Sequence, residues 1–310
     1  MTAPPLVVEV ERSGLVESTH LVDVAIVAAG GAIVAAAGDR ETITYLRSTA
    51  KPVQASVCLD AGWPATADDA VAIACASHNG EPAHLDAVRR VLSAAGLSED
   101  DLLCPPALPR DPTAASEPAR IFHNCSGKHA AMLATAALNG WSRRDYRVED
   151  LPLQRAVADR LSALAGRVPR AVGIDGCGVP TFAYALEDAA RIFSSLPADA
   201  PRAVAAMRAH PFLVAGTGRL CTAVLGSVPG VVIKVGAEGM FCGVLIDQGV
   251  GFALKARDGA VRAAEAAAVM TLQFLRVVPD EVPANLAPAP VLGGGAPVGT
   301  LRIRGELSHS

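Results

Sequence analysis

Lysine is scarce in this chain of 310 residues. Lys and Arg together number 27, and only Lys51, Lys128, Lys234 and Lys255 among them are lysines. A lysine amine can lose its proton inside a protein, whereas an arginine guanidinium cannot. We therefore expect the few lysines at positions that need a deprotonatable amine. Codon bias combined with ordinary surface lysines is the alternative explanation.

Runs of basic residues are absent, and the net charge is −4 with a pI of about 6.0, so we expect no nucleic-acid partner. The chain starts without a charged segment followed by an apolar one, so no signal peptide is expected. The most apolar stretch, residues 21–38, is interrupted by Asp23 and the pair Gly30-Gly31, which favours a hairpin over a membrane span. Seven cysteines, an odd number, indicate free thiols in a reducing cytoplasm.

Strand patterns lie at both ends of the chain, and helical patterns lie between them. We expect one domain over residues 1–310, of mixed α/β class, with sheet regions at 6–47 and 212–305 and a mainly helical region at 48–211. In this arrangement a single antiparallel sheet takes strands from both terminal thirds. The C-terminal expectations are strands at 220–225, 231–235, 240–246 and 251–256, a helix at 260–275 and a strand at 301–303.

A serine and a lysine three residues apart follow the first strands. Ser48 and Lys51 would share one helical face, with about 5–6 Å between their Cβ atoms. A neutral amine at that distance can take the hydroxyl proton and make the serine a nucleophile. The spacing matches the S-x-x-K motif of serine acyl-transfer enzymes, although a single short motif has a high false-positive rate.

Two further polar clusters interrupt apolar segments. Ser77-His78-Asn79 matches the second polar pair of S-x-x-K enzymes, with a helix end and turn as the plain alternative. The run from His123 to His129 contains Cys125, Lys128 and His129 ahead of an apolar helix. Cys125 and His129 have the spacing of two metal ligands on one helix face, although a lone cysteine is usually buried packing.

The segment Asp175-Gly176-Cys177-Gly178 is expected as a turn between a strand and a helix. Asp175 could bind an ammonium group and Cys177 could be a thiolate ligand, and a simple tight turn is the alternative. The glycine-rich segment Gly216-Thr217-Gly218-Arg219 lacks the spacing of a dinucleotide site. Lys234 and Lys255 lie on expected strands, and either could face Ser77.

Taken together, these segments resemble the bacterial asparaginase II family, of the inducible Rhizobium etli type. The similarity extends in order from about residue 7 to 305. The matching segments are Leu46–Pro52, Ser77–Glu81, His123–His129, Asp175–Ala183, Gly216–Arg219, Val235–Gly239 and Leu254–Gly259.

The resemblance implies an L-asparagine amidohydrolase of the serine β-lactamase and glutaminase-like fold, acting as a homodimer. It implies two Ser–Lys pairs, Ser48 with Lys51 and Ser77 with Lys255, and Lys234 competes for the second lysine position. It further implies a zinc ion (Zn2+) bound by two cysteines and a lysine, which match Cys125, Lys128 and Cys177. Ligand chemistry alone would favour His129 over the lysine.

The expected substrate is a small zwitterion and needs one basic and one acidic partner. Arg47 suits its carboxylate through a bidentate contact, Asp175 suits its ammonium, and Asn79 and His129 are further candidate contacts. The alternatives are another S-x-x-K hydrolase, either a glutaminase or a lactam-processing enzyme, and a non-catalytic protein that binds amino acids or zinc.

Overall fold

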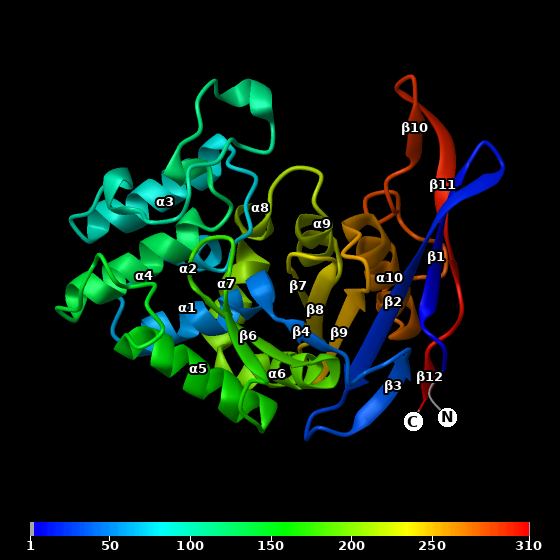
Figure 1. Ribbon diagram of the computed structural model, residues 1–310, viewed down its shortest axis with the longest axis horizontal. Helices are drawn as coiled ribbons and strands as arrows, with labels where there is room; N and C mark the ends of the chain where they lie inside the picture. The colour runs from blue at the N-terminus through cyan, green and yellow to red at the C-terminus, as the bar shows by residue number, and fades with distance from the viewer. Residues whose placement is uncertain (1–2, 310) are drawn as a thin grey trace. The chain divides into compact units, whose positions relative to one another are not determined.

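The computed structural model describes residues 3–309. Its internal contacts divide the chain into two compact units. The sheet unit contains the N-terminal segment up to Thr49, Tyr184–Ser195 and the segment from Ser227 onward. The helical unit contains Ala50–Ala183 and Leu196–Gly226. Figure 1 labels the elements of both units.

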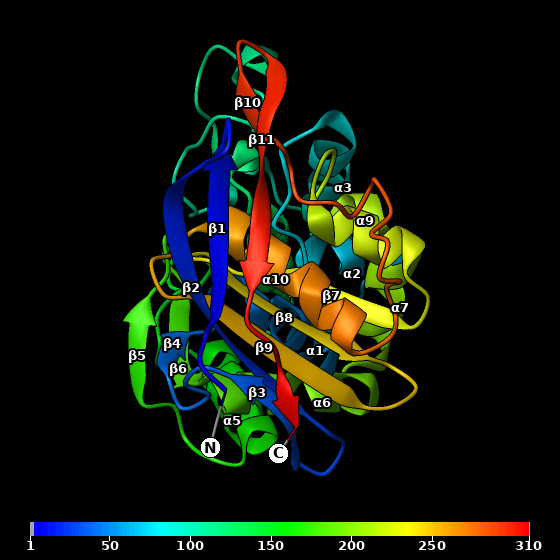
Figure 2. The same ribbon diagram turned by 90° about the vertical axis from the view of Figure 1, so that its right-hand side faces the viewer.

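The sheet unit is built on an antiparallel sheet that combines the two ends of the chain, as expected. Its strands run in the order β10-β11-β1-β2-β9-β8-β7, and β3 pairs with both β2 and β12 (Figure 2). The expected hairpin is present, because β2 and β3 pair antiparallel on either side of Gly30-Gly31. The strands are β1 (Leu6–Arg12), β2 (Leu15–Val27), β3 (Ile33–Ala37), β7 (Val231–Val235), β8 (Met240–Leu245), β9 (Val250–Ala256), β10 (Val291–Gly293), β11 (Ala296–Arg304) and β12 (Ser308–His309), with a short β4 (Ile43–Tyr45) and the 3-10 turn η1 (Arg47–Ala50) following β3.

Both faces of the sheet are covered at strands β7 and β8. Every residue of β7 and β8 is buried, which requires packing on each side of the sheet. The alanine-rich helix α10 (Val261–Phe274) packs against β9, β2 and β8 (Figure 2), and its small side chains allow a close approach. Helix α6 (Leu186–Asp199) comes close enough to β9 that a Cβ atom at Gly251 would lie 2.2 Å from Ala190 O.

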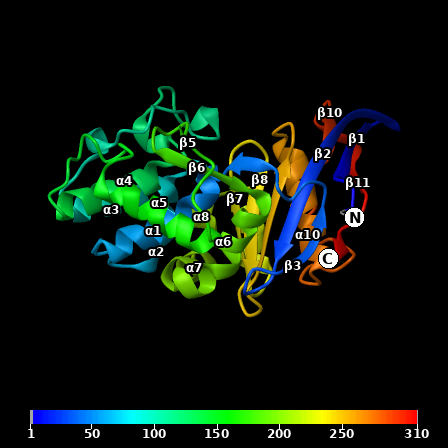
Figure 3. The ribbon, with the colours of Figure 1, turned by 60° about the horizontal axis from the view of Figure 1, so that its bottom comes forward.

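The helical unit packs short helices around the almost wholly buried α4 (Figure 3). Gly127 of α4 allows the closest approach, since a Cβ atom there would lie 2.1 Å from Ile73 O of α2. The helices are α1 (Lys51–Asp60), α2 (Asp68–Ala74), α3 (Pro82–Ala94), α4 (Ser126–Leu138), α5 (Pro152–Ala165), α7 (Pro201–Ala209), α8 (Pro211–Val214) and α9 (Leu220–Ser227), with 3-10 turns η2 (Glu99–Asp101), η3 (Pro112–Ala114) and η4 (Arg120–Phe122) and the paired strands β5 (Ala171–Ile174) and β6 (Pro180–Ala185).

Two secondary-structure expectations are wrong. Residues 220–225 form helix α9 instead of a strand, with Leu220, Cys221, Val224 and Leu225 buried at helical spacing. The helix expected after Asp175 is strand β6, whose residues are all buried. A short apolar run without alternation does not distinguish a buried strand from a buried helix.

The expected fold class is confirmed: the structure is mixed α/β, with an antiparallel sheet from both ends of the chain and a helical region between them. Within residues 3–309, no helix combines the length and apolar character that crossing a bilayer requires. The seven cysteines are free thiols, and all of them are buried.

The contact between β9 and α6 provides a test of the sheet unit. We expect Gly251→Ala to lower the free energy of unfolding by about 1–3 kcal/mol, because the new Cβ atom would overlap backbone atoms of Ala190 and Ser194. Urea denaturation measures this change. Gly226→Ala is the matched control, since its nearest contact would be an ordinary 3.8 Å. Equal stability of both variants would contradict the described packing.

Candidate functional site

Lys51 lies at the start of α1 and is fully buried, with 0% of its surface exposed. Its Nζ atom donates to Ser77 Oγ at 3.0 Å, to Ala76 O, and to Asn124 O at 3.4 Å. A buried amine requires such oxygen partners, because losing water without replacement costs several kcal/mol. The lysine of the S-x-x-K motif is thus hydrogen-bonded to the serine of the second motif.

Ser77 follows α2 and is 4% exposed. Its backbone N–H donates to Val214 O at 2.9 Å, and the N–H of Asn79 donates to Ala215 O at 2.9 Å. The segment from Ser77 to Asn79 is therefore fixed on the C-terminal end of α8 and the residue that follows it. Lys51 and Ser77 are far apart in the sequence, so no local spacing indicates their hydrogen bond.

His78 is a neutral histidine in a defined tautomer. Its Nδ1 accepts from Gly80 N–H at 3.1 Å, so Nε2 carries the proton and donates to Ser126 Oγ at 2.9 Å. Burial, together with the neighbouring His84 and Lys51, holds the pKa of His78 well below its usual range. This ring supports the Ser77 segment as an uncharged hydrogen-bonding group.

The three residues predicted to bind the metal ion, Cys125, Lys128 and Cys177, converge inside the helical unit. Lys128 Nζ donates to Cys177 Sγ at 3.2 Å, and the Cys177 thiol donates a hydrogen bond to Cys125. That hydrogen bond, aided by Lys51 and Lys128, holds the pKa of Cys125 well below its usual range despite burial. The same bond and burial raise the pKa of Cys177. Burial alone would lower the pKa of Lys128, but Cys177, Cys125 and Asp175 raise it.

This donor set suits a soft metal ion in part. Two cysteine sulfurs, one of them favoured as a thiolate, are ligands that zinc prefers. Lys128 would have to give up its proton to coordinate, and the neighbouring negative charge opposes that loss. Residues 3–309 contain no group of three or more His, Cys, Asp and Glu side chains arranged for a metal ion, so the lysine is needed for a third ligand.

Two predicted substrate contacts lie close to this cluster. Asp175 lies in a turn, as expected: its side chain accepts from Gly176 N–H at 2.7 Å and its carbonyl accepts from Gly178 N–H. His129 Nδ1 is 2.5 Å from the Tyr146 hydroxyl, which also accepts from Leu103 N–H. The buried Nε2 of His129 has no hydrogen-bond partner among the described residues.

The sheet unit contains the other predicted catalytic residues. Arg47 has φ of +50°, a left-handed conformation that is uncommon for any residue except glycine, and half-buried Ser48 follows it in η1. The Thr49 hydroxyl donates to Leu46 O at 2.7 Å, which fixes this turn. The strained backbone thus occurs one residue before the predicted nucleophile.

Lys234 and Lys255 lie on the same face of the sheet. Lys234 is opposite Cys242, Cys242 is opposite Ala253, and Ala253 and Lys255 are two residues apart on β9. Lys234 is fully buried, and it interacts electrostatically with Cys242, whose thiol is hydrogen-bonded to Thr49. Through Cys242 and Thr49, Lys234 is thus connected to the turn that carries Ser48.

Lys255 is half-buried, and its Nζ donates to Ala256 O. Burial lowers the pKa of Lys255, and the carboxylates of Glu238, Asp258 and Asp23 oppose that effect.

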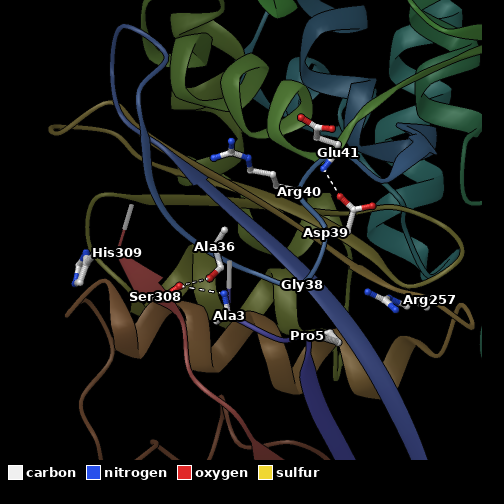
Figure 4. A pocket seen from close by; sticks show the side chains of 10 residues that line it. All are labelled: Ala3, Pro5, Ala36, Gly38, Asp39, Arg40, Glu41, Arg257, Ser308 and His309. Carbon is white, nitrogen blue, oxygen red and sulfur yellow. Dashed lines mark hydrogen bonds between the residues drawn. The ribbon is translucent and has the colours of Figure 1, made fainter. Parts of the chain in front are cut away.

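The hollow drawn in Figure 4 lies in the sheet unit. Its volume is about 770 Å³, and Figure 4 shows the side chains that line it, including Arg40, Arg257 and Ser308. The Arg257 guanidinium makes two 2.8 Å bonds to the buried Asp23 carboxylate. This hollow contains none of the predicted catalytic or metal-binding residues.

Sequence reasoning missed three participants in these networks. Tyr146 orients His129, Glu81 binds the side chain of Asn79, and Arg219 donates to Asn79 Oδ1. Glu81 and Arg219 lie within segments that the resemblance had matched, but no spacing rule indicates their contact. Glu81 and Arg219 are far apart in the sequence, and the fold brings both of them into contact with Asn79.

The model of a family of amidohydrolases matches residues 8–303. That family is L-asparaginase II, and the chain belongs to it. No curated protein matches the chain.

Several solved structures are similar to this chain at low sequence identity. A Bacillus glutaminase in 4.3 M NaCl matches over 83% of this chain and 91% of its own, with 13% identity and a TM-score of 0.48. The protein Mglu in its native form matches over 82% of this chain and 64% of its own, with 16% identity and a TM-score of 0.49. A β-lactamase from Mycobacterium bovis matches over 83% of this chain and 95% of its own, with 15% identity and a TM-score of 0.38.

The buried histidines predict how stability depends on pH. Burial is the largest cause that lowers the pKa of His78, His84 and His129, so the folded chain keeps these rings neutral. Below about pH 6.5 the unfolded chain takes up protons that the folded chain does not. We expect the free energy of unfolding to fall by up to about 1.4 kcal/mol per pH unit for each histidine between pH 6.5 and 5.

Urea denaturation at half-unit pH steps measures this slope. His78→Gln should reduce the slope by the share of one histidine. A free energy of unfolding that stays constant from pH 7.5 to 5 would contradict the neutral assignment of these rings.

Proposed function

We propose that the protein hydrolyses the side-chain amide of L-asparagine to L-aspartate and ammonia through a covalent acyl-enzyme. The observation that carries the proposal is the 3.0 Å contact between Lys51 Nζ and Ser77 Oγ, with both residues buried. When its amine is uncharged, Lys51 can accept a hydroxyl proton there. Membership of the L-asparaginase II family supports the choice of substrate.

In this mechanism Ser48 is the nucleophile. Its oxygen forms a bond to the amide carbon, its proton passes to Lys51, and the carbon–nitrogen bond breaks as ammonia leaves with that proton. Water then cleaves the β-aspartyl ester with assistance from Ser77 and Lys255, and Lys234 is the alternative lysine. The Ser48 backbone N–H and a strand N–H are the proposed oxyanion donors, each worth about 3–4 kcal/mol.

The substrate contacts are also proposals. Arg47 would bind the α-carboxylate and Asp175 the α-ammonium. His129 and Asn79 would be further substrate contacts. The homodimer, the R. etli type and the cytoplasmic location are proposals of the same kind. The seven free cysteines support the reducing location.

A bound zinc ion is the proposed cofactor, held by Cys125, Lys128 and Cys177. The convergence of two sulfurs and an amine in a buried cluster supports it. When bound, zinc would supply a fixed positive charge that organises this cluster and the adjacent turn at Asp175. The residues of the chain would hold it by giving up thiol and ammonium protons.

An ammonia-release assay tests the function. We expect the purified protein to release ammonia from L-asparagine faster than from L-glutamine and to resist acylation by penicillin. Acylation by penicillin without asparagine turnover would instead favour a lactam-processing enzyme. Asparagine binding without any ammonia would favour a non-catalytic binding protein.

The two serines have different expected effects. Ser48→Ala should lower kcat by about 10⁴-fold or more, because it removes the nucleophile. Ser77→Ala should lower it less, by about 10–1,000-fold, because it removes one proton-transfer partner. Ser93→Ala, on the exposed face of α3, is the control. Full activity in the Ser48 variant would show that Ser48 is not the nucleophile, and inactivity of the Ser77 variant alone would assign that role to Ser77.

Zinc is tested by metal analysis of protein purified without added metal. We expect about one zinc ion per chain, and its loss in Cys177→Ser. Chelation should lower the melting temperature of the wild type, since metal binding stabilises only the folded state. Cys242→Ser, in the sheet unit, should keep its zinc. A chain that carries no zinc and takes none up would overturn the assignment.

A further inference from the structure

Strand β5 ends the order of its sheet and has one open edge (Figure 2). It pairs antiparallel with residues 180–183 of β6, and both segments belong to the helical unit. Within residues 3–309, no strand pairs with its other side. An open edge presents backbone donors and acceptors to any chain that can add a strand there.

The pairing with β6 determines which backbone groups of β5 point outward. Asp175 N–H donates to Val179 O at 2.9 Å, whereas Pro180, which lies opposite Ile174, has no N–H to donate. Hydrogen-bonded and non-hydrogen-bonded pairs alternate along an antiparallel ladder. The N–H and C=O groups of Val172 and Ile174 therefore point away from β6.

The edge is apolar and carries no protection of its own. Ile174 is 84% exposed and Val172 is 39% exposed. Natural edge strands are usually protected against pairing by a charged side chain, a proline or a β-bulge. The four residues of β5, Ala-Val-Gly-Ile, include neither a charge nor a proline, and their register against β6 has no shift. The strand thus has the features of an edge that accepts a partner strand.

An exposed apolar patch adjoins this edge. Val148, Val172 and Ile174 together line a hollow of about 570 Å³, and Val148 is 50% exposed. Val172 and Ile174 are two residues apart, so their side chains lie on the same face of the strand. Apolar side chains that gather on a surface in this way mark interaction sites.

The charges around the hollow indicate which partner it suits. Its lining includes two residues of each sign, Arg144 and Arg147 with Asp145 and Glu149. A contact across a two-fold axis brings a patch against a copy of itself, and a patch of a single sign would then repel its copy. A patch with both signs can instead place opposite charges opposite each other. The balance therefore favours a second copy of this chain over a partner of one strong charge.

We propose that a second copy of this chain docks on β5, with the two β5 strands antiparallel and edge to edge across a two-fold axis. The backbone groups of Val172 and Ile174 would form the ladder, and the apolar patch and its charges would form the contact beside it. This inference gives the proposed homodimer an interface. Because β5 leads directly into the turn of Asp175 and Cys177, the docked copy would also hold the strand that carries this turn.

Measurement of the molar mass in solution tests the interface. Light scattering during size-exclusion chromatography, at concentrations up to about 100 μM, should give twice the 31.7 kDa of one chain. Ile174→Lys should raise the dissociation constant of the dimer by about 100-fold or more, because each copy would bring an unpaired positive charge into the contact. The far-UV circular dichroism of this variant should match that of the wild type, since the side chain is exposed in the single chain.

A second variant tests the backbone ladder. Val172→Pro removes an N–H group that points away from β6, a position at which an edge strand tolerates proline. It should raise the dissociation constant by about tenfold or more, because each copy loses one hydrogen bond. Val172→Thr keeps the N–H group and should stay within about threefold of the wild type.

Leu292→Lys is the matched control, because Leu292 is an exposed apolar residue of β10 in the sheet unit. It should leave the dissociation constant within about twofold of the wild-type value. A wild-type chain that stays monomeric overturns the proposal, as does a dimer that Ile174→Lys or Val172→Pro leaves unchanged, or one that Leu292→Lys weakens equally. These masses do not depend on turnover, so failure of the proposed reaction and failure of this interface are observed separately.

Discussion

The amine of Lys51 is the group on which the interior of the helical unit depends. It is fully buried, and it is satisfied by a hydroxyl and two backbone carbonyls from different segments. Leaving such a group without partners would cost several kcal/mol, so the segments at Ser77 and Asn124 must stay where they are. The hydrogen bonds of this one nitrogen atom therefore hold together the start of α1, the segment after α2 and the segment before α4.

The surrounding polar groups extend this constraint outward. His78 and His84 each accept a hydrogen bond on Nδ1, from Gly80 N–H and Glu81 N–H respectively, and His129 Nδ1 is hydrogen-bonded to the Tyr146 hydroxyl. The rings of His78 and His84 therefore each have one defined tautomer, and burial, which lowers the pKa of all three rings, keeps them uncharged. Glu81 adds a carboxylate to the Asn79 network, and Arg219 contributes the opposite charge through its bond to Asn79 Oδ1. The site is thus preorganised by donors and acceptors that are already matched.

The sequence predicted what local patterns control. The hairpin across Gly30-Gly31 and the helices at α4 and α10 follow from turn chemistry and apolar periodicity. The segment at 220–225 was misassigned although its buried positions have helical spacing, because the run is short and apolar throughout. The segment at 180–185 was misassigned because every position is buried and neither period appears.

The site was predictable to a similar extent. The spacing of Ser48 and Lys51 and the cysteine–lysine set could be read from the chain, and the structure brings Cys125, Lys128 and Cys177 together. The bond from Lys51 to Ser77 and that from Glu81 to Thr217 connect residues far apart in the chain. Pairing of this kind is decided by packing, and no local pattern encodes it.

The buried thiols give the molecule a set of internal reporters. Cys242 lies in the sheet unit, and the other cysteines, Cys58, Cys75, Cys104, Cys125, Cys177 and Cys221, lie in the helical unit. An alkylating reagent reaches a buried sulfur only when the surrounding structure opens. The labelling rate of each thiol therefore records how often the structure around it opens. Mass spectrometry of the labelled cysteines can thus follow local opening in each unit of the native chain without any introduced probe.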